Sequence, residues 1–246
     1  MSLCIIKKMK RSKKFIYKFL VGIALFSVVI TVIIVLLNIK VTTRQGINFQ
    51  VQTIRIPVYL KIIDFFDRHY NYKQLVQRII KNEQDKQKRV MKIFSWTYHN
   101  IRKQPENLLI IDDHVWHIIV RGYGLSDQSC DVFATLCNYA GIDAFYASVS
   151  TKDMNRKIRL SFVRLHNRWH VFDPYNGVYF INNAGVLVDT DEIKKGNYQL
   201  EYLGTPKETV LDYRDYFDNL PDINKVGLRR VKIQSPFKRL LYELKK

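Results

Sequence analysis

An uncharged apolar run near the N-terminus sets the strongest constraint on what this chain of 246 residues can fold into. Residues Phe19 to Ile39 read FLVGIALFSVVITVIIVLLNI and contain no charged side chain. At a rise of about 1.5 Å per residue, a helix of this length crosses the roughly 30 Å hydrocarbon core of a bilayer. The run therefore predicts a transmembrane helix over residues 19–39.

The charges beside this run indicate its orientation. Seven Lys and Arg residues and no acid precede it, whereas Lys40 and Arg44 are the charges that closely follow it. Because basic flanks stay in the cytoplasm, we expect residues 1–18 to form a basic cytoplasmic tail and the chain after Lys40 to be extracytoplasmic, either periplasmic or at the cell surface. A cleaved signal peptide is the alternative, but its apolar core would be shorter and would end in small residues. The end of the run, NIKVTTRQ, offers no such cleavage site.

The net charge of +18 limits the classes of partner. Nine of the 40 Lys and Arg residues and none of the 22 acids lie in residues 1–44, which leaves 31 bases and 22 acids, or +9, for the rest. A basic domain could bind nucleic acid, anionic lipid or an acidic glycan. Placement outside the cytoplasm counts against nucleic acid. The alternative is that the Lys-rich surface only keeps the domain soluble.

The cysteines do not form a disulfide framework. Cys130 and Cys137 lie seven residues apart on one predicted helix, hence about 10.5 Å apart along its axis, which is too far for a bridge. Cys4 lies on the cytoplasmic side of the apolar run. We therefore expect the roughly 200 residues after the run to form one domain that is stabilised by its apolar core.

The first part of the domain reads as helical. Residues 40–57 alternate apolar and polar residues and predict an extended linker. From Val58 to Ile80 apolar residues recur at helical spacing, with a predicted break near Asn71. A second helix follows and is closed by Pro105, and its apolar face carries Val90, Ile93, Phe94, Thr97 and Ile101.

A buried helix and a set of strands make up the second part. After Gly124, apolar residues at helical spacing predict a helix with Ser126 as its N-cap and Gly141 as its left-handed stop. The stretches AFYASVS, IRLSFVRL and WHVFDP then read as strands, the last two joined in a hairpin with Asn167 at its turn. The order predicts an α+β fold in which a central buried helix packs on an antiparallel sheet.

Two stretches together resemble the transglutaminase-like superfamily, which shares the papain-like cysteine-protease fold. They are GYGLSDQSCDVFATLCNYAGIDA and IRLSFVRLHNRWHVFDPYNGVYF. The resemblance covers roughly Val90 to Ile193 and implies a transglutaminase-like domain over residues 58–200. It also implies a catalytic Cys at the start of the helix, a His on the first hairpin strand and an Asp at the end of the second.

Carried over residue by residue, the resemblance leaves one member of that triad in place. Counting from Gly124 and back from Gly141, the Cys position is Ser126 both times. The Asp position is Asp173, which precedes a proline. The His position is Ile158, or Leu160 after a shift of two residues along the same strand face. The resemblance therefore implies a domain that is degenerate at its Cys and His positions.

Other residues could restore catalysis. Cys130 lies four residues after Ser126 on the same helix face but about 6 Å deeper, where a free Cys usually acts as a small apolar residue. Ser126 would need a base, and His114 or His117 could fold back over the helix start. Asp112 and Asp113 join these histidines as potential metal ligands, but without a second cluster we predict no metal site and no cofactor.

The C-terminal residues 201–246 read as a basic extension. From Pro236 a short helix would carry Lys and Arg on one side and Phe237, Leu240, Leu241 and Leu244 on the other. Such a helix could lie on an anionic membrane surface, or it could be an ordinary solvated terminus with docked leucines.

The sequence thus favours a single-pass membrane protein whose transglutaminase-like domain is a pseudoenzyme. In this hypothesis the domain binds a peptide or a cell-surface glycan, with a role in envelope or polysaccharide assembly by family analogy. One alternative is an active hydrolase or acyl transferase that uses Ser126 or Cys130. Another is a purely structural partner of a second membrane protein.

Overall fold

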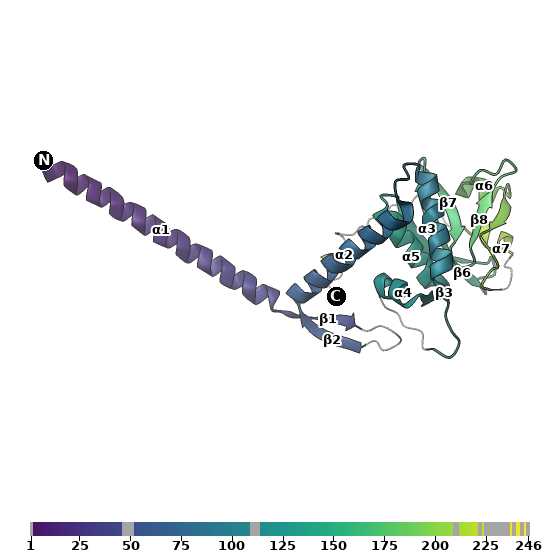
Figure 1. The fold of residues 1–246 in the computed structure, drawn as a ribbon, viewed down its shortest axis with the longest axis horizontal. Helices are drawn as coiled ribbons and strands as arrows, with labels where there is room; N and C mark the ends of the chain where they lie inside the picture. Colours follow the sequence, from purple (N-terminus) through teal and green to yellow (C-terminus); the bar gives the residue numbers. More distant parts are fainter. Residues whose placement is uncertain are drawn as a thin grey trace.

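A long N-terminal helix and a mixed α/β domain make up the part of the chain that the computed structural model describes (Figure 1). This part comprises residues 2–45, 52–108, 114–208 and 212–220, with single residues at 223, 237, 240, 241 and 244. Helix α1 runs over Ser2–Leu37, and its segment Ile16–Leu37, with a mean hydropathy of 3.2, is long and apolar enough to cross a membrane. None of that segment is buried against the domain. The helix ends two residues before the predicted end of the apolar run.

A β-hairpin connects α1 to the domain, in place of the simple linker predicted for residues 40–57. Strand β1 (Lys40–Gln45) pairs antiparallel with β2 (Gln52–Pro57). The alternating sequence is extended, as predicted, but the two halves satisfy each other's backbone groups instead of leaving them to water.

Four helices form the first layer of the domain. Helix α2 (Val58–Ile80) is unbroken, so the predicted break near Asn71 is wrong. The Asn71 amide donates to the Asp67 carboxylate at 3.1 Å, one turn earlier, and stays compatible with the helix. Helix α3 (Lys86–Asn100) is N-capped by Asp85, whose side chain accepts the Lys88 N–H. The short α4 (Val115–Arg121) follows.

Helix α5 (Ser126–Tyr139) is the predicted central helix. Its N-cap is Leu125, so Ser126 is the first helical residue rather than the cap that we predicted. Gly141, with φ of 76°, supplies the predicted left-handed stop. The apolar face that the spacing predicts is buried, with zero exposure for Cys130, Val132, Phe133, Ala134, Leu136 and Cys137.

Two short strands, β3 (Arg102–Lys103) and β4 (Tyr123–Gly124), pair in parallel. The five strands that follow α5 form one antiparallel sheet in chain order. They are β5 (Ala144–Ser150), β6 (Lys157–Leu165), β7 (Arg168–Asp173), β8 (Val178–Ile181) and β9 (Gln199–Tyr202). The predicted hairpin of β6 and β7 closes with two residues of positive φ, His166 at 49° and Asn167 at 63°. This is the turn geometry that matches the twist of paired strands. The predicted α+β fold is confirmed.

Two apolar clusters cover the two faces of the sheet. One contains the buried side chains of α2 to α5 together with Val163, Leu165 and Phe172 of the sheet. The other lies on the opposite face, where α6 (Thr190–Lys194) and α7 (Arg214–Phe217) contribute. The domain therefore continues past the predicted boundary at residue 200, because the second cluster is completed by Tyr213, Tyr216, Phe217, Leu220 and Ile223.

Part of the predicted C-terminal helix lies within the described residues. Phe237, Leu240, Leu241 and Leu244 are helical, and the Phe237 ring lies 5.7 Å from the His69 ring of α2. The remainder of the predicted amphipathic segment lies outside the described residues.

Candidate active site

A tight turn presents Ser126 at the start of α5. Gly124 approaches Gln128 so closely that a Cβ at the glycine would lie 3.1 Å from the Gln128 Cβ. The Gln128 Oε1 accepts the Leu125 N–H at 3.1 Å and a guanidinium N–H of Arg121 at 3.3 Å. The close packing of Gly124 on Gln128 and the hydrogen bonds of the Gln128 side chain thus stabilise the predicted glycine turn before α5.

Ser126 is half-buried and lies beside the N-terminal N–H groups of α5. The first N–H groups of a helix have no intrahelical partner and form a favourable environment for negative charge. Within the described part of the chain, no histidine side chain hydrogen-bonds the Ser126 hydroxyl. His114 precedes α4, and its ring lies 5.7 Å from the ring of His117. Asp112 and Asp113 lie outside the described residues.

Cys130 is packed as a core residue. It has zero exposure, its thiol donates to the Arg159 carbonyl at 3.4 Å, and its carbonyl accepts the Ser161 hydroxyl at 3.3 Å. Burial raises the pKa of the Cys130 thiol well above its usual value, and the nearby Asp173 carboxylate raises it further. Since the thiolate is the nucleophilic form, this environment opposes the role of Cys130 as a nucleophile.

Alkylation tests this description of Cys130. In the full chain with Cys4→Ser, we expect iodoacetamide to modify Cys130 and Cys137 slowly in the folded state and rapidly in denaturant, because burial raises the pKa of both thiols. Peptide mass spectrometry gives the extent of modification. A Lys152→Cys variant, at an exposed turn, supplies the fast control. Modification of Cys130 as fast as that control in the folded chain would contradict the structure.

The strand residues that the resemblance aligns with histidine point away from α5. Ile158 and Leu160 belong to the cluster on the opposite sheet face, whereas the neighbouring Arg159 and Ser161 make the contacts to Cys130. The structure therefore does not bring Ile158 or Leu160 to Ser126. A period of two along a strand means that only the odd-numbered positions of β6 face the helix here.

Asp173 anchors a buried turn. Its side chain is 2% exposed and accepts the backbone N–H groups of Tyr175 at 3.1 Å and Asn176 at 3.0 Å. The Asn176 amide donates to it at 2.9 Å and the Tyr213 hydroxyl at 2.7 Å. Burial raises the pKa of Asp173, and these hydrogen bonds act in the opposite direction. The carboxylate is thus engaged by four donors, none of which is a histidine.

Lys207 lies between the Asp173 turn and the end of helix α3. Its ammonium donates to the carbonyls of Tyr98 at 3.0 Å and Ile101 at 2.6 Å, which end helix α3, and lies 5.4 Å from the Tyr175 ring centre. Burial lowers the pKa of Lys207 to about 8, while the Asp173 carboxylate acts to raise it. Neither Lys207 nor Tyr213 belongs to a sequence pattern, so sequence reasoning missed both members of this network.

The two hairpin histidines lie away from Ser126. His170 is 9% exposed, and its Nδ1 lies 2.9 Å from the Val188 carbonyl; burial lowers the pKa of this imidazole. His170 lies opposite Val163 in the middle of β7, whereas Asp173 is the last residue of this strand. His166 is in the β6–β7 turn.

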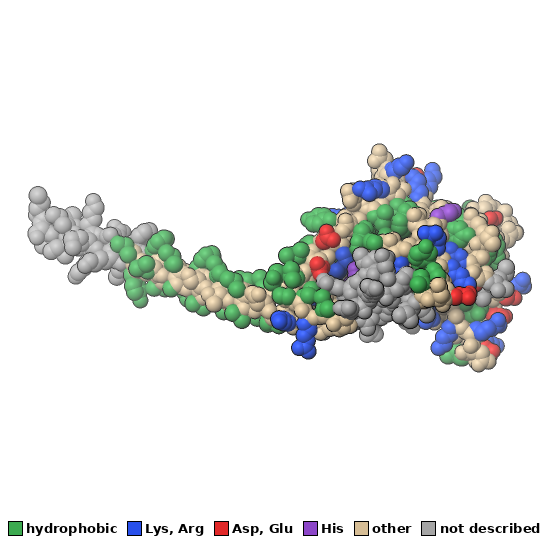
Figure 2. All heavy atoms as spheres, turned by 60° about the horizontal axis from the view of Figure 1, so that its bottom comes forward, with side chains coloured by type: hydrophobic (Ala, Val, Ile, Leu, Met, Phe, Trp, Pro, Cys, Tyr) green, Lys and Arg blue, Asp and Glu red, His purple; other side chains and the backbone are tan. Residues whose placement is uncertain are grey.

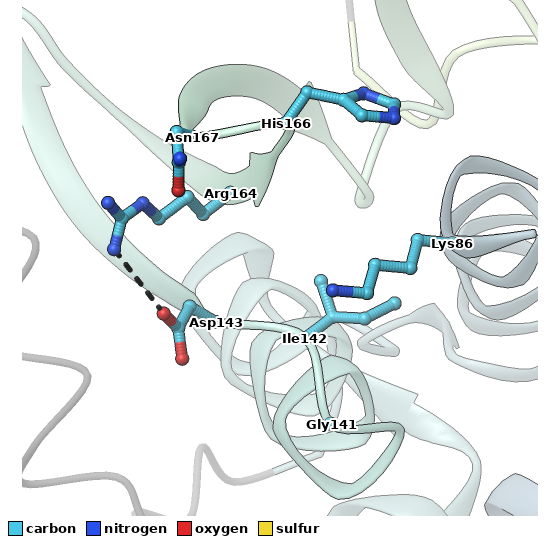
Figure 3. A pocket seen from close by; sticks show the side chains of 7 residues that line it. All are labelled: Lys86, Gly141, Ile142, Asp143, Arg164, His166 and Asn167. Carbon is cyan, nitrogen blue, oxygen red and sulfur yellow. Dashed lines mark ion pairs between the residues drawn. The ribbon is translucent and has the colours of Figure 1, made fainter.

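A depression of about 350 Å³ opens between the end of α5 and the hairpin turn (Figure 3). In it Asp143 and Arg164 form an ion pair at 3.8 Å, and Lys86 extends from the start of α3 toward Ile142. Its lining is Lys86, Gly141, Ile142, Asp143, Arg164, His166 and Asn167. This depression lies at the end of α5 opposite Ser126. A second, wider depression along α2 and α3 is lined by Ile79, Lys81, Met91, Lys92, Ser95, Trp96, His99 and Asn100.

Solved structures with likeness to this chain include two described as candidate proteases and one described as a TGase. A candidate cysteine protease from Cytophaga hutchinsonii shares 13% identity with a TM-score of 0.39, over 55% of this chain and 47% of that one. A structure described as a TGase shares 12% identity with a TM-score of 0.36, over 54% of this chain and 43% of that one. A candidate protease from Parabacteroides distasonis shares 11% identity with a TM-score of 0.36, over 54% and 35%. The chain thus spans less than half the length of each.

The sequence comparisons give one family. No curated protein matches the chain significantly. The family model described as the transglutaminase-like superfamily matches residues 73–181, which contain α5, the β6–β7 hairpin and the Asp173 turn. Residues 73–181 therefore belong to the transglutaminase-like superfamily.

Proposed function

We propose that this protein is a membrane-anchored, extracytoplasmic transglutaminase-like domain that binds an anionic peptide or cell-surface glycan and catalyses no acyl transfer. One observation carries the non-catalytic part: among the described residues no histidine hydrogen-bonds the Ser126 hydroxyl at the helix start, while Cys130 is fully buried. A serine hydroxyl without a base is a poor nucleophile. A role in envelope or polysaccharide assembly follows by family analogy.

The placement outside the cytoplasm rests on charge. The seven basic residues that precede the uncharged run 19–39 lie on a helix without acids, and by the positive-inside rule this basic end of α1 remains cytoplasmic. The domain on the other side of α1 would then face the periplasm or the cell exterior, where peptides and glycans of the envelope are its available ligands.

The depression at the end of α5 is the proposed binding site (Figure 3). Lys86, Arg164 and His166 line it, against one acid, Asp143, which is already paired with Arg164. In the described part of the chain, the Arg164 Nε is buried and has no hydrogen-bond partner. Cationic groups around a concave, partly apolar site favour an anionic group of a ligand. Its volume of about 350 Å³ suits one sugar ring or one side chain.

A binding measurement tests the ligand class. The full chain in detergent micelles is titrated with a fluorescent acidic oligosaccharide (oligogalacturonate), with a poly-glutamate peptide and with neutral oligogalactan. We expect binding of an acidic probe only, weakened about five- to tenfold by Lys86→Glu, since one charge reversal near an exposed site is worth about 1 kcal/mol. Lys88→Glu, with the same charge change on the same helix but outside the depression, is the matched control.

Two outcomes would contradict the proposal. The first is absence of binding by both acidic probes, or equal weakening by Lys86→Glu and Lys88→Glu. The second is covalent labelling of the folded chain by a fluorophosphonate probe that disappears in Ser126→Ala. That result would establish a serine enzyme in place of a binding domain.

A further inference from the structure

Helix α2 begins where the apolar helix α1 ends. The Val58 N–H donates to the Ile39 carbonyl at 2.9 Å, and Lys40 pairs with Pro57 at the base of the hairpin. The chain thus leaves α1, makes the β1–β2 hairpin and returns to the same point. If Ile16–Leu37 spans a bilayer, the first turn of α2 lies at the level of the lipid headgroups.

One face of α2 carries large apolar side chains that the domain leaves uncovered. The exposed fractions are 39% for Tyr59, 58% for Ile63, 37% for Phe66 and 66% for Tyr70. These positions follow the i, i+4, i+7, i+11 spacing of one helix face. Leu60 adjoins them at 37%. The core side of α2 is a different face, which carries Phe65, His69, Tyr72 and Val76.

The apolar character of this face stops halfway along the helix. The exposed residues farther from α1 on α2 are polar or basic, and include Lys73, Gln74, Gln77 and Arg78. Exposed apolar side chains are therefore confined to the half of α2 that starts beside the membrane helix. Figure 2 shows hydrophobic side chains along α1 that continue onto the adjoining part of the domain. If α2 only faced water, its exposed side chains would be polar along the whole helix and not only in the half farther from α1.

We propose that the face formed by Tyr59, Leu60, Ile63, Phe66 and Tyr70, the α2 apolar face, lies in the headgroup–acyl boundary of the bilayer that α1 spans. Tyr59 and Tyr70 are suited to this boundary because the apolar ring of a Tyr can enter while its hydroxyl stays hydrated, and the apolar Leu60, Ile63 and Phe66 side chains can enter fully. The 12 residues from Tyr59 to Tyr70 extend about 18 Å. The exposed basic residues Lys40 and Arg55 lie within the first three residue pairs of the hairpin, next to the start of α2, and favour anionic headgroups. Contact of this face would fix the tilt of the domain against the membrane.

Site-specific fluorescence in the full chain tests this proposal. In a Cys4→Ser background, a cysteine is added as Ile63→Cys or as Gln74→Cys and labelled with NBD in the folded chain, where Cys130 and Cys137 are buried. The labelled chains are reconstituted into vesicles of phosphatidylcholine and phosphatidylglycerol. Both positions are exposed, lie on α2 and are eleven residues apart, so they share a face. We expect NBD at position 63 to be quenched severalfold more by lipid-borne doxyl groups than NBD at position 74. Aqueous iodide should show the reverse order.

Two results would overturn the proposal. One is equal quenching of both positions by iodide in chains whose insertion is verified by protease protection. The other is a rapid disulfide between two Ile63→Cys chains together with absence of lipid quenching, which would identify a second copy as the occupant. The label at position 74 reports any membrane affinity of the fluorophore itself. This test is independent of ligand binding at the end of α5.

Discussion

The Asp173→Ala variant is expected to lose about 3–5 kcal/mol of unfolding free energy, because the substitution leaves four buried donors without an acceptor. Those donors are the N–H groups of Tyr175 and Asn176, the Asn176 amide and the Tyr213 hydroxyl. Each unsatisfied donor costs about 1–3 kcal/mol unless water enters. Denaturant unfolding of the full chain in detergent, followed by the circular dichroism of the domain, measures the loss.

A second carboxylate provides a matched control. Asp153 also accepts hydrogen bonds within a turn, from Asn155 and Thr151, but this turn is exposed. We expect Asp153→Ala to cost about 1 kcal/mol or less. If Asp173→Ala does not fold, Tyr213→Phe removes one donor only and should cost about 1 kcal/mol. Equal effects of the two Asp→Ala changes would show that the Asp173 network does not stabilise the fold.

Gly177→Ala is expected to cost about 3 kcal/mol, through two separate effects. Gly177 has φ of 70°, which disfavours a side chain by about 1–2 kcal/mol. A Cβ there would also lie 2.7 Å from the Tyr98 ring, and overpacking adds about 1–3 kcal/mol. The ring cannot simply withdraw, because the Tyr98 hydroxyl donates to the Thr205 carbonyl at 2.6 Å.

Gly185→Ala separates these two effects. Gly185 has nearly the same φ, 74°, but open space around the position of a Cβ. The same unfolding measurement should therefore give about 1 kcal/mol for Gly185→Ala. A cost for Gly177→Ala no larger than this would mean that the Tyr98 ring accommodates the methyl group. In a Tyr98→Leu background, the cost of Gly177→Ala should fall toward that of Gly185→Ala.

Elements with strong local periodicity could be predicted from the sequence. The spacing in α5, the alternation in β6 and β7 and the stop at Gly141 are contained in short windows, and the structure matches them. The predicted break in α2 failed because Asn71 was read as a helix breaker, whereas its side chain bonds Asp67 within the helix. The hairpin before α2 was missed because alternation indicates an extended chain but not its pairing partner.

The site was harder to predict because it depends on contacts between residues that are far apart in the sequence. The position of Ser126 and the turn at Asp173 follow from motifs, but the groups that determine their chemistry come from distant parts of the chain. Tyr213 reaches Asp173 from 40 residues away, and Lys207 bonds α3 across more than 100 residues. The face of β6 that meets α5 depends on how the sheet packs, which the alternation of IRLSFVRL leaves open.

The aromatic residues that cover one face of the sheet follow all of its strands in the sequence, and this order has a consequence for biosynthesis. All five strands of the sheet have left the ribosome once Tyr202 has emerged, yet the aromatic residues that cover one face, Tyr213, Tyr216 and Phe217, come afterwards. Until then Phe145, Phe162 and Phe180 on that face would be uncovered, and such transient surfaces promote aggregation. Until the segment with Tyr213, Tyr216 and Phe217 has been synthesised and has packed on the sheet, the nascent domain needs a chaperone to prevent aggregation through this face.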